Sequence, residues 1–202
     1  FLSNAFYFAL LVVGHEPSIP DFGDEIWMQV GIFTTASVWE EIESRVLLIG
    51  VPIMCIDFLF RRERVASPIK YILGGNMEIG IPESGAALFS SLIFGLAHVE
   101  WWDFWKFFPA AVTGLFLAYL FMRFGLYAAI ILHFMLNFFD MPFVVIDRSS
   151  EFGLPIILLV FGLWGFVKYG KTLLGFVYHD LMKVPRPGPP RATTAGDGKT
   201  LR

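Results

Sequence analysis

Long apolar runs constrain the fold of this chain more than any other feature of its sequence. They recur along the 202 residues and approach the roughly 20 residues that cross a bilayer as a helix. Hydrophobic residues make up 56% of the chain, and the mean hydropathy is +0.64. Lipid offers the backbone no hydrogen-bond partners, so spanning segments are helices or barrel strands, and these runs lack the alternation of barrel strands. The sequence therefore predicts an all-α, polytopic transmembrane helical bundle of about five to six spans in a multi-pass membrane protein.

The apolar runs and the polar segments between them predict two parts. Residues 1–182 form a transmembrane helical domain, and residues 183–202 form a disordered Pro/Gly-rich tail with too few apolar residues to fold. The longest apolar region, 26–60, exceeds one hydrocarbon core, so it is tilted, kinked at Pro52 or divided into two pieces. Further spans are predicted at about 83–98, 108–122, 126–139 and 154–167, and residues 1–14 are interpreted as the end of another helix.

Small residues recur every four positions in the predicted helix at 108–122. They are Ala110, Gly114 and Ala118, and on a helix they lie on one face. Small residues on one face allow two helix backbones to approach closely. The stripe therefore predicts helix packing.

Basic residues predict the orientation of the bundle. If the basic run at 61–64 is cytoplasmic, then Arg123, Lys168, Lys171 and the tail lie on the same side, as the positive-inside rule requires. The C-terminus is accordingly expected on the cytoplasmic side. The net charge of −3 is small and mixed along the chain, so no nucleic-acid partner is expected, and the main surroundings are membrane lipid.

A cluster of charges interrupts the apolar region, in the stretch SVWEEIESRVLLIG at residues 37–50. The four charged residues are Glu40, Glu41, Glu43 and Arg45. Each charged side chain at mid-bilayer costs on the order of 2.5 to 3.5 kcal/mol, so all four must face protein or water. Glu41 and Arg45 are four residues apart and share a helix face, which predicts an ion pair. That pair leaves Glu40 and Glu43 unexplained. The alternative is a cluster that lies at a membrane interface and is solvated.

Two other predicted helices carry polar residues at membrane depth. His98 ends one apolar run, and His133 and Asn137 lie four apart on one face of another. Taken singly, each of these residues more often makes a hydrogen bond between helices than a catalytic contact. Taken together with the glutamates, they predict one shared polar site. A glutamate beside imidazoles can deprotonate a water, and a second imidazole with an amide can stabilise an oxyanion, which is the chemistry of peptide-bond hydrolysis.

The polar residues match three ordered motifs. The segment from Glu40 to Arg45 fits EExxxR, the segment from Phe94 to His98 fits FxxxH, and the segment from His133 to Asn137 fits HxxxN. This order resembles the CAAX-protease and bacteriocin-processing (CPBP) family of intramembrane proteases, which includes the type II CAAX prenyl endopeptidases. The resemblance covers about residues 26–140.

The resemblance implies a fold, an activity and roles for the site residues. A bundle of this family would hold a conical polar pocket inside the membrane and cleave a membrane-associated peptide, either a prenylated tail or a leader peptide. Glu40 would activate water, with His98 assisting, and no cofactor would be needed. Glu41 and Arg45 would support the first motif, and His133 and Asn137 would form the oxyanion site.

Two alternatives stay open from the residues alone. A zinc protease would use Glu40, His98 and His133 as metal ligands, although the chain contains no HExxH. A non-catalytic relative would act as a scaffold or assembly factor in a larger membrane complex. Its partners would bind an exposed aromatic corner and the C-terminal tail. The corner contains Trp101, Trp102 and Trp105.

Overall fold

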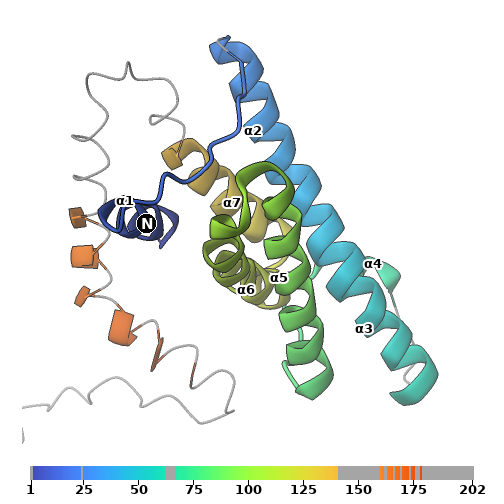
Figure 1. Cartoon of the computed structure of the whole chain (residues 1–202). Helices are drawn as coiled ribbons and strands as arrows, with labels where there is room; N and C mark the ends of the chain where they lie inside the picture. The colour runs from blue at the N-terminus through green and yellow to red at the C-terminus, as the bar shows by residue number, and fades with distance from the viewer. Residues whose placement is uncertain are drawn as a thin grey trace, which may run out of the picture.

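The computed structural model describes residues 2–23, 25–61 and 67–140. It also describes helical residues at 160–161, 163–165, 167–168, 170–172, 174–175 and 178. Every regular element within these residues is helical, which confirms the all-α prediction (Figure 1). The predicted tail at 183–202, most of the basic run at 61–64 and much of the predicted span at 154–167 lie outside the described residues.

The described helices follow the order expected from the apolar runs. Helix α5 begins and ends a few residues outside the predicted span at 83–98, since it continues through two tryptophans to a break at Asp103 with φ of 68°. The elements are α1 (Leu2–Val12), α2 (Ile26–Glu41), η1 (Ile42–Gly50), α3 (Val51–Ile56), η2 (Asp57–Arg61), α4 (Pro68–Leu73), α5 (Ile81–Trp102), η3 (Phe104–Lys106), α6 (Phe107–Phe124) and α7 (Leu126–Asp140).

The longest apolar region is one continuous helix (Figure 1). Segments α2, η1, α3 and η2 follow one another without a break, and the joining residues Ile42, Val51 and Asp57 all have right-handed helical dihedrals. Residues 26–61 thus span roughly 50 Å. Pro52 lies in the first turn of α3, next to the end of the π-helical segment η1. The division into two pieces, one of the three alternatives, is therefore wrong.

The π-helical segments of this long helix have a cause in the sequence. Every fourth residue is buried along it. On an α-helix of 3.6 residues per turn, a four-residue repeat drifts by about 40° per step. A π-helix has wider i→i+5 turns and corrects this drift, so the repeat keeps facing the rest of the bundle. The buried residues of the repeat are Gln29, Phe33, Ser37, Glu41, Arg45, Ile49, Ile53 and Asp57.

The small-residue stripe on α6 packs against α5, as predicted. Ala110 and Ala118 are buried, and a Cβ added at Gly114 would lie only 3.1 Å from the Cα of Ser91. Gly125, with φ of 104°, then ends α6 and lets the chain turn into α7. Close packing of α5 on α6 and the short turn to α7 bring α5 and α7 to the same side of the long helix (Figure 1).

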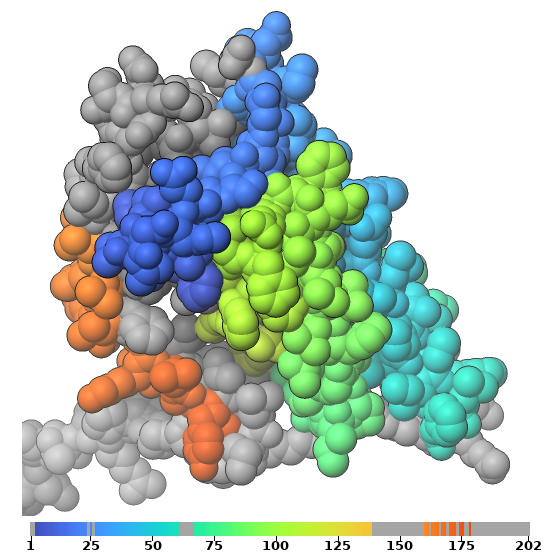
Figure 2. Space-filling view, viewed as in Figure 1, coloured from blue at the N-terminus to red at the C-terminus, as the bar shows by residue number. Residues whose placement is uncertain are grey.

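The aromatic corner is only partly exposed. Trp101 is 69% exposed, but Trp105 is 8% exposed and donates its indole N–H to the Ser18 carbonyl at 3.0 Å. Trp102 packs between Phe22 and Trp105, with ring centroids 5.8 and 6.1 Å apart. The expectation of an exposed Trp105 is therefore wrong, because the loop between α1 and α2 covers it (Figure 2 shows this loop against α5).

One helical stretch among the described residues is long and apolar enough to cross a membrane, by length and composition. It runs over Phe104–Phe124, and its most apolar window has a mean hydropathy of 1.6. Two shorter apolar helices lie at Ser3–Val12 and Leu126–Phe138. The predicted number of five to six spans thus stays a prediction.

Candidate active site

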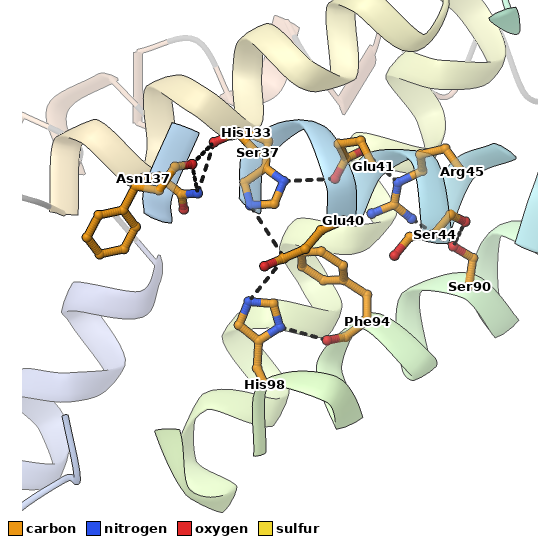
Figure 3. A network of polar contacts seen from close by, with 11 residues as sticks. Ser37, Glu40, Glu41, Ser44, Arg45, Ser90, Phe94, His98, His133 and Asn137 are labelled. Atoms are coloured by element: carbon orange, nitrogen blue, oxygen red, sulfur yellow. Dashed lines mark hydrogen bonds and ion pairs between the residues drawn. The ribbon is translucent and has the colours of Figure 1, made fainter. Parts of the chain in front are cut away.

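Three helices bring the residues of the three motifs together (Figure 3). Glu40 and Glu41 are the last two residues of α2, and Arg45 follows in η1. His98 comes from α5, and His133 with Asn137 comes from α7.

Glu40 lies between the two imidazoles. Its Oε2 atom is 3.8 Å from Nε2 of His98 and 3.8 Å from Nε2 of His133. These separations exceed a direct hydrogen bond and match polar groups that are bridged by a water. The Glu40 side chain is 35% exposed, yet Oε2 itself is buried and has no hydrogen-bond partner among the residues that the structure describes. The carboxylate is therefore a buried acceptor aimed at a point shared by both rings.

Hydrogen bonds determine the tautomer of each imidazole. Nδ1 of His98 is 2.8 Å from the Phe94 carbonyl oxygen, and Nδ1 of His133 is 3.0 Å from Oε1 of Glu41. A carbonyl and a carboxylate only accept, so each Nδ1 carries the hydrogen. In the neutral ring, each Nε2 then directs a lone pair toward Glu40. Three acceptors meet at one place, which suits a molecule that donates protons, such as water.

Glu41 and Arg45 form the ion pair that their spacing predicts. Nε of Arg45 lies 2.9 Å from Oε2 of Glu41, and both side chains are fully buried. The solvated-cluster alternative is therefore wrong for this pair. The same alternative agrees with the position of Glu43, which is exposed on the opposite side of the helix. The cluster thus divides into a buried pair, a half-exposed Glu40 and a solvent-facing or lipid-facing Glu43.

Asn137 lies beside α2 and not beside Glu40. Its amide nitrogen donates to Oγ of Ser37 at 3.0 Å and to the Phe33 carbonyl oxygen at 3.4 Å (Figure 3). Both amide hydrogens therefore have acceptors on the long helix. The oxyanion role expected for Asn137 stays a prediction.

Three serines belong to the network although none of them was predicted from the sequence. Ser37 accepts from Asn137, and Ser90 joins Arg45 to the carbonyl oxygen of Ser44. One signal pointed to Ser90: it lies four residues before Phe94 and eight before His98, on the same helix face as the second motif.

The donor types of Glu40, His98 and His133 match a catalytic zinc set. Their arrangement does not assemble one, because residues 2–23, 25–61, 67–140 and the helical positions beyond hold no group of three or more His, Cys, Asp or Glu side chains placed to bind a metal. The zinc alternative therefore stays a prediction with its own test.

The fold and the site together define a class: an all-helical protein in which a carboxylate and two imidazoles converge, groups that can serve in general acid–base chemistry. A family model described as type II CAAX prenyl endopeptidase Rce1-like matches residues 22–139, more than half of the chain. The chain belongs to this family, which confirms the resemblance drawn from the three motifs. The family is a membrane-embedded protease family. No curated protein and no solved structure matches the chain.

Proposed function

We propose that this chain is an intramembrane endopeptidase that hydrolyses a peptide bond of a membrane-associated substrate with a water activated by Glu40. One observation carries the proposal: within the described part of the chain, Oε2 of Glu40 is buried, has no hydrogen-bond partner and lies 3.8 Å from an imidazole nitrogen on each side. A carboxylate in this position can take a proton from a water that the Nε2 atoms also contact.

The reaction uses the remaining groups in order. Glu40 takes one proton from water, and the resulting hydroxide attacks the scissile carbonyl carbon to give a tetrahedral oxyanion. The proton that Glu40 took from water then passes to Nε2 of His133, 3.8 Å from Oε2, and the resulting imidazolium uses it to donate a hydrogen bond to the oxyanion while Glu41, bound to Nδ1–H, stabilises the cation. Collapse of the intermediate breaks the C–N bond, and the leaving amine takes this proton from His133.

Asn137 completes an oxyanion site only after an exchange of hydrogen bonds. Its amide would release the Phe33 carbonyl, the longer of its two contacts at 3.4 Å, and donate to the oxyanion while keeping Ser37 at 3.0 Å. Such tightening in the substrate complex is common in enzymes.

The membrane setting of the proposal rests on the family and on the apolar helices. We infer a multi-pass bundle with a conical polar pocket inside the membrane and the C-terminus in the cytoplasm. The substrate is a peptide or protein held at the membrane, either a prenylated C-terminal segment or a leader peptide. Both classes place a peptide bond close to lipid, where a half-exposed Glu40 can reach it.

The test is a cleavage assay of the full chain in lipid vesicles. Prenylated and unprenylated peptides and leader peptides are offered to the wild-type chain and to Glu40→Gln. Glu43→Gln is the matched control, because the same change is made three residues away on an exposed side chain. Cleavage that is lost in Glu40→Gln and kept in Glu43→Gln supports the proposal. Equal cleavage by all three chains would refute it.

A second arm of the same assay addresses zinc. The purified chain is analysed for bound metal and assayed with and without chelator. Full activity after metal removal supports the water-activating glutamate. Activity that is lost with chelator and restored by zinc would favour the zinc alternative, with Glu40, His98 and His133 as ligands.

The scaffold alternative has one supporting observation. Trp101 at the end of α5 and Phe104 at the start of η3 are 69% and 61% exposed, which suits a contact with a membrane partner. Trp102, Trp105 and the C-terminal tail were the other predicted contacts. If the chain co-purifies with a large complex whose function is unaffected by Glu40→Ala, this alternative replaces the protease.

A further inference from the structure

Ser90 occupies a special place in the buried network. Its side chain is fully buried in the middle of α5. Its hydroxyl lies 2.8 Å from Nη1 of Arg45 and 2.6 Å from the backbone carbonyl oxygen of Ser44 (Figure 3). It therefore connects α5 both to the π-helical backbone of η1 and to the ion pair within it.

The chemistry of each group allows only one direction for this chain of hydrogen bonds. The Ser44 carbonyl only accepts, so the Ser90 hydroxyl donates to it. Arginine only donates, so Ser90 accepts from Arg45. Arg45 then donates from Nε to Oε2 of Glu41, and Oε1 of Glu41 accepts from Nδ1–H of His133. This series of hydrogen bonds starts at the Ser44 carbonyl and ends at His133, where it places the hydrogen on Nδ1.

Arg45 depends on Ser90 for its orientation. The guanidinium is fully buried, its Nη2 has no hydrogen-bond partner in residues 2–23, 25–61 and 67–140 or the helical positions beyond, and Phe94 offers only a ring face whose centroid is 5.2 Å away. Glu41 and Ser90 thus supply its two hydrogen bonds. Without the Ser90 hydroxyl, one bond to Nε would hold the guanidinium, and rotation about that bond would redirect the carboxylate that binds His133.

We propose that Ser90 is a positioning residue that fixes the tautomer and orientation of His133 through Arg45 and Glu41. The inference rests on the proposed function for its effect on catalysis, but the effect on His133 can be measured without any substrate. Outer hydrogen-bond partners that orient metal-binding histidines change activity by about 10- to 100-fold when they are removed, and we expect an effect of this size here.

The kinetic experiment compares three variants of the full chain in vesicles. Ser90→Ala removes the hydroxyl, and Ser90→Thr keeps one. Ser91→Ala is the matched control, because Ser91 is equally buried in the next position and donates only to the Ala87 carbonyl of its own helix. We expect kcat to fall about 10- to 100-fold in Ser90→Ala with KM within about twofold. Ser90→Thr should restore most of kcat, and Ser91→Ala should match wild type.

The second measurement is the ¹⁵N spectrum of the histidine rings in the substrate-free chain, which has four histidines. The His133 signals are assigned with His133→Gln. In the wild-type chain we expect a ring that carries its hydrogen on Nδ1, and in Ser90→Ala a mixture of the two tautomers. If Ser90→Ala fails to fold, Ser90→Cys, which has nearly the same volume but only a weak donor, takes its place.

The outcomes separate the two proposals. A tautomer mixture in Ser90→Ala supports the positioning role even if no peptide is cleaved, in which case only the proposed function fails. A His133 spectrum in Ser90→Ala identical to that of Ser91→Ala would overturn the inference, whatever the cleavage assay gives. A fall in kcat of equal size in Ser90→Ala and Ser91→Ala would also overturn it, since any buried hydroxyl would then have the same effect.

Discussion

Two neighbouring glutamates meet opposite surroundings in this protein. Glu41 is fully buried, and both of its oxygens bind a fixed donor, Arg45 or His133. Glu40 is half-buried, and its Oε2 has no direct hydrogen-bond partner in the part of the chain that the structure describes. A carboxylate whose acceptors are all occupied stabilises structure, whereas one with an unoccupied acceptor can take part in a reaction. If Glu40 activates the water as proposed, the end of α2 provides a fixed half, Glu41, and a reactive half, Glu40, of the same site.

The largest effect is expected from Glu40→Gln. The amide keeps the shape of the side chain but cannot take a proton, so cleavage should fall by about 10²- to 10⁴-fold. Because Oε2 makes no direct hydrogen bond to the described residues, the unfolding free energy should change by no more than about 1 kcal/mol, the usual effect of a single substitution. Peptide cleavage and thermal unfolding in detergent measure the two values. A large loss of stability would contradict the division into two halves.

Glu41→Gln should act mainly on stability. The change leaves the fully buried Arg45 without its counter-charge, and removing one partner of a buried pair costs about 3–5 kcal/mol. Chemical denaturation of the purified chain measures this loss. A variant as stable as wild type would show that the pair contributes little to the fold.

Asn137→Ala should have an intermediate effect. It removes the donor to Ser37 and Phe33 and leaves those acceptors on α2 without this bond, at a cost of about 1–3 kcal/mol. If the amide also binds the oxyanion, kcat falls while KM stays nearly constant. Stability and kinetics measured on the same preparation separate the structural role from the catalytic one.

Glu43→Gln and His15→Ala should have the smallest effects. Both residues are exposed and neither belongs to the network around Glu40. Surface substitutions of this kind change stability by less than about 0.5 kcal/mol, and cleavage should remain at the wild-type rate. A tenfold fall in cleavage by Glu43→Gln would extend the reactive half of the site to the outer face of the long helix.

The sequence predicts which segments are helical and which polar residues come together, but not how the individual side chains are buried or oriented. Apolar runs and four-residue spacings were sufficient to predict the ion pair of Glu41 with Arg45, since both residues lie on one helix. The burial of Trp105 depends on a contact with Ser18, which lies 87 positions earlier in the sequence, and no local pattern encodes that contact. The direction of the Asn137 amide likewise depends on how α7 packs against α2, which spacing within α7 does not specify.

The π-helical winding of η1 has a consequence for any change in the length of the long helix. Each residue of a helix turns the following side chains by about 100°. Deleting one residue between Ile42 and Gly50 would be absorbed by a return toward α-helical winding, because a π-helical turn holds more residues than an α-helical turn, and Ile53 and Asp57 would keep facing the interior. The π-helical segment therefore lets Glu41 near one end and Asp57 near the other end of one long helix face the same bundle interior.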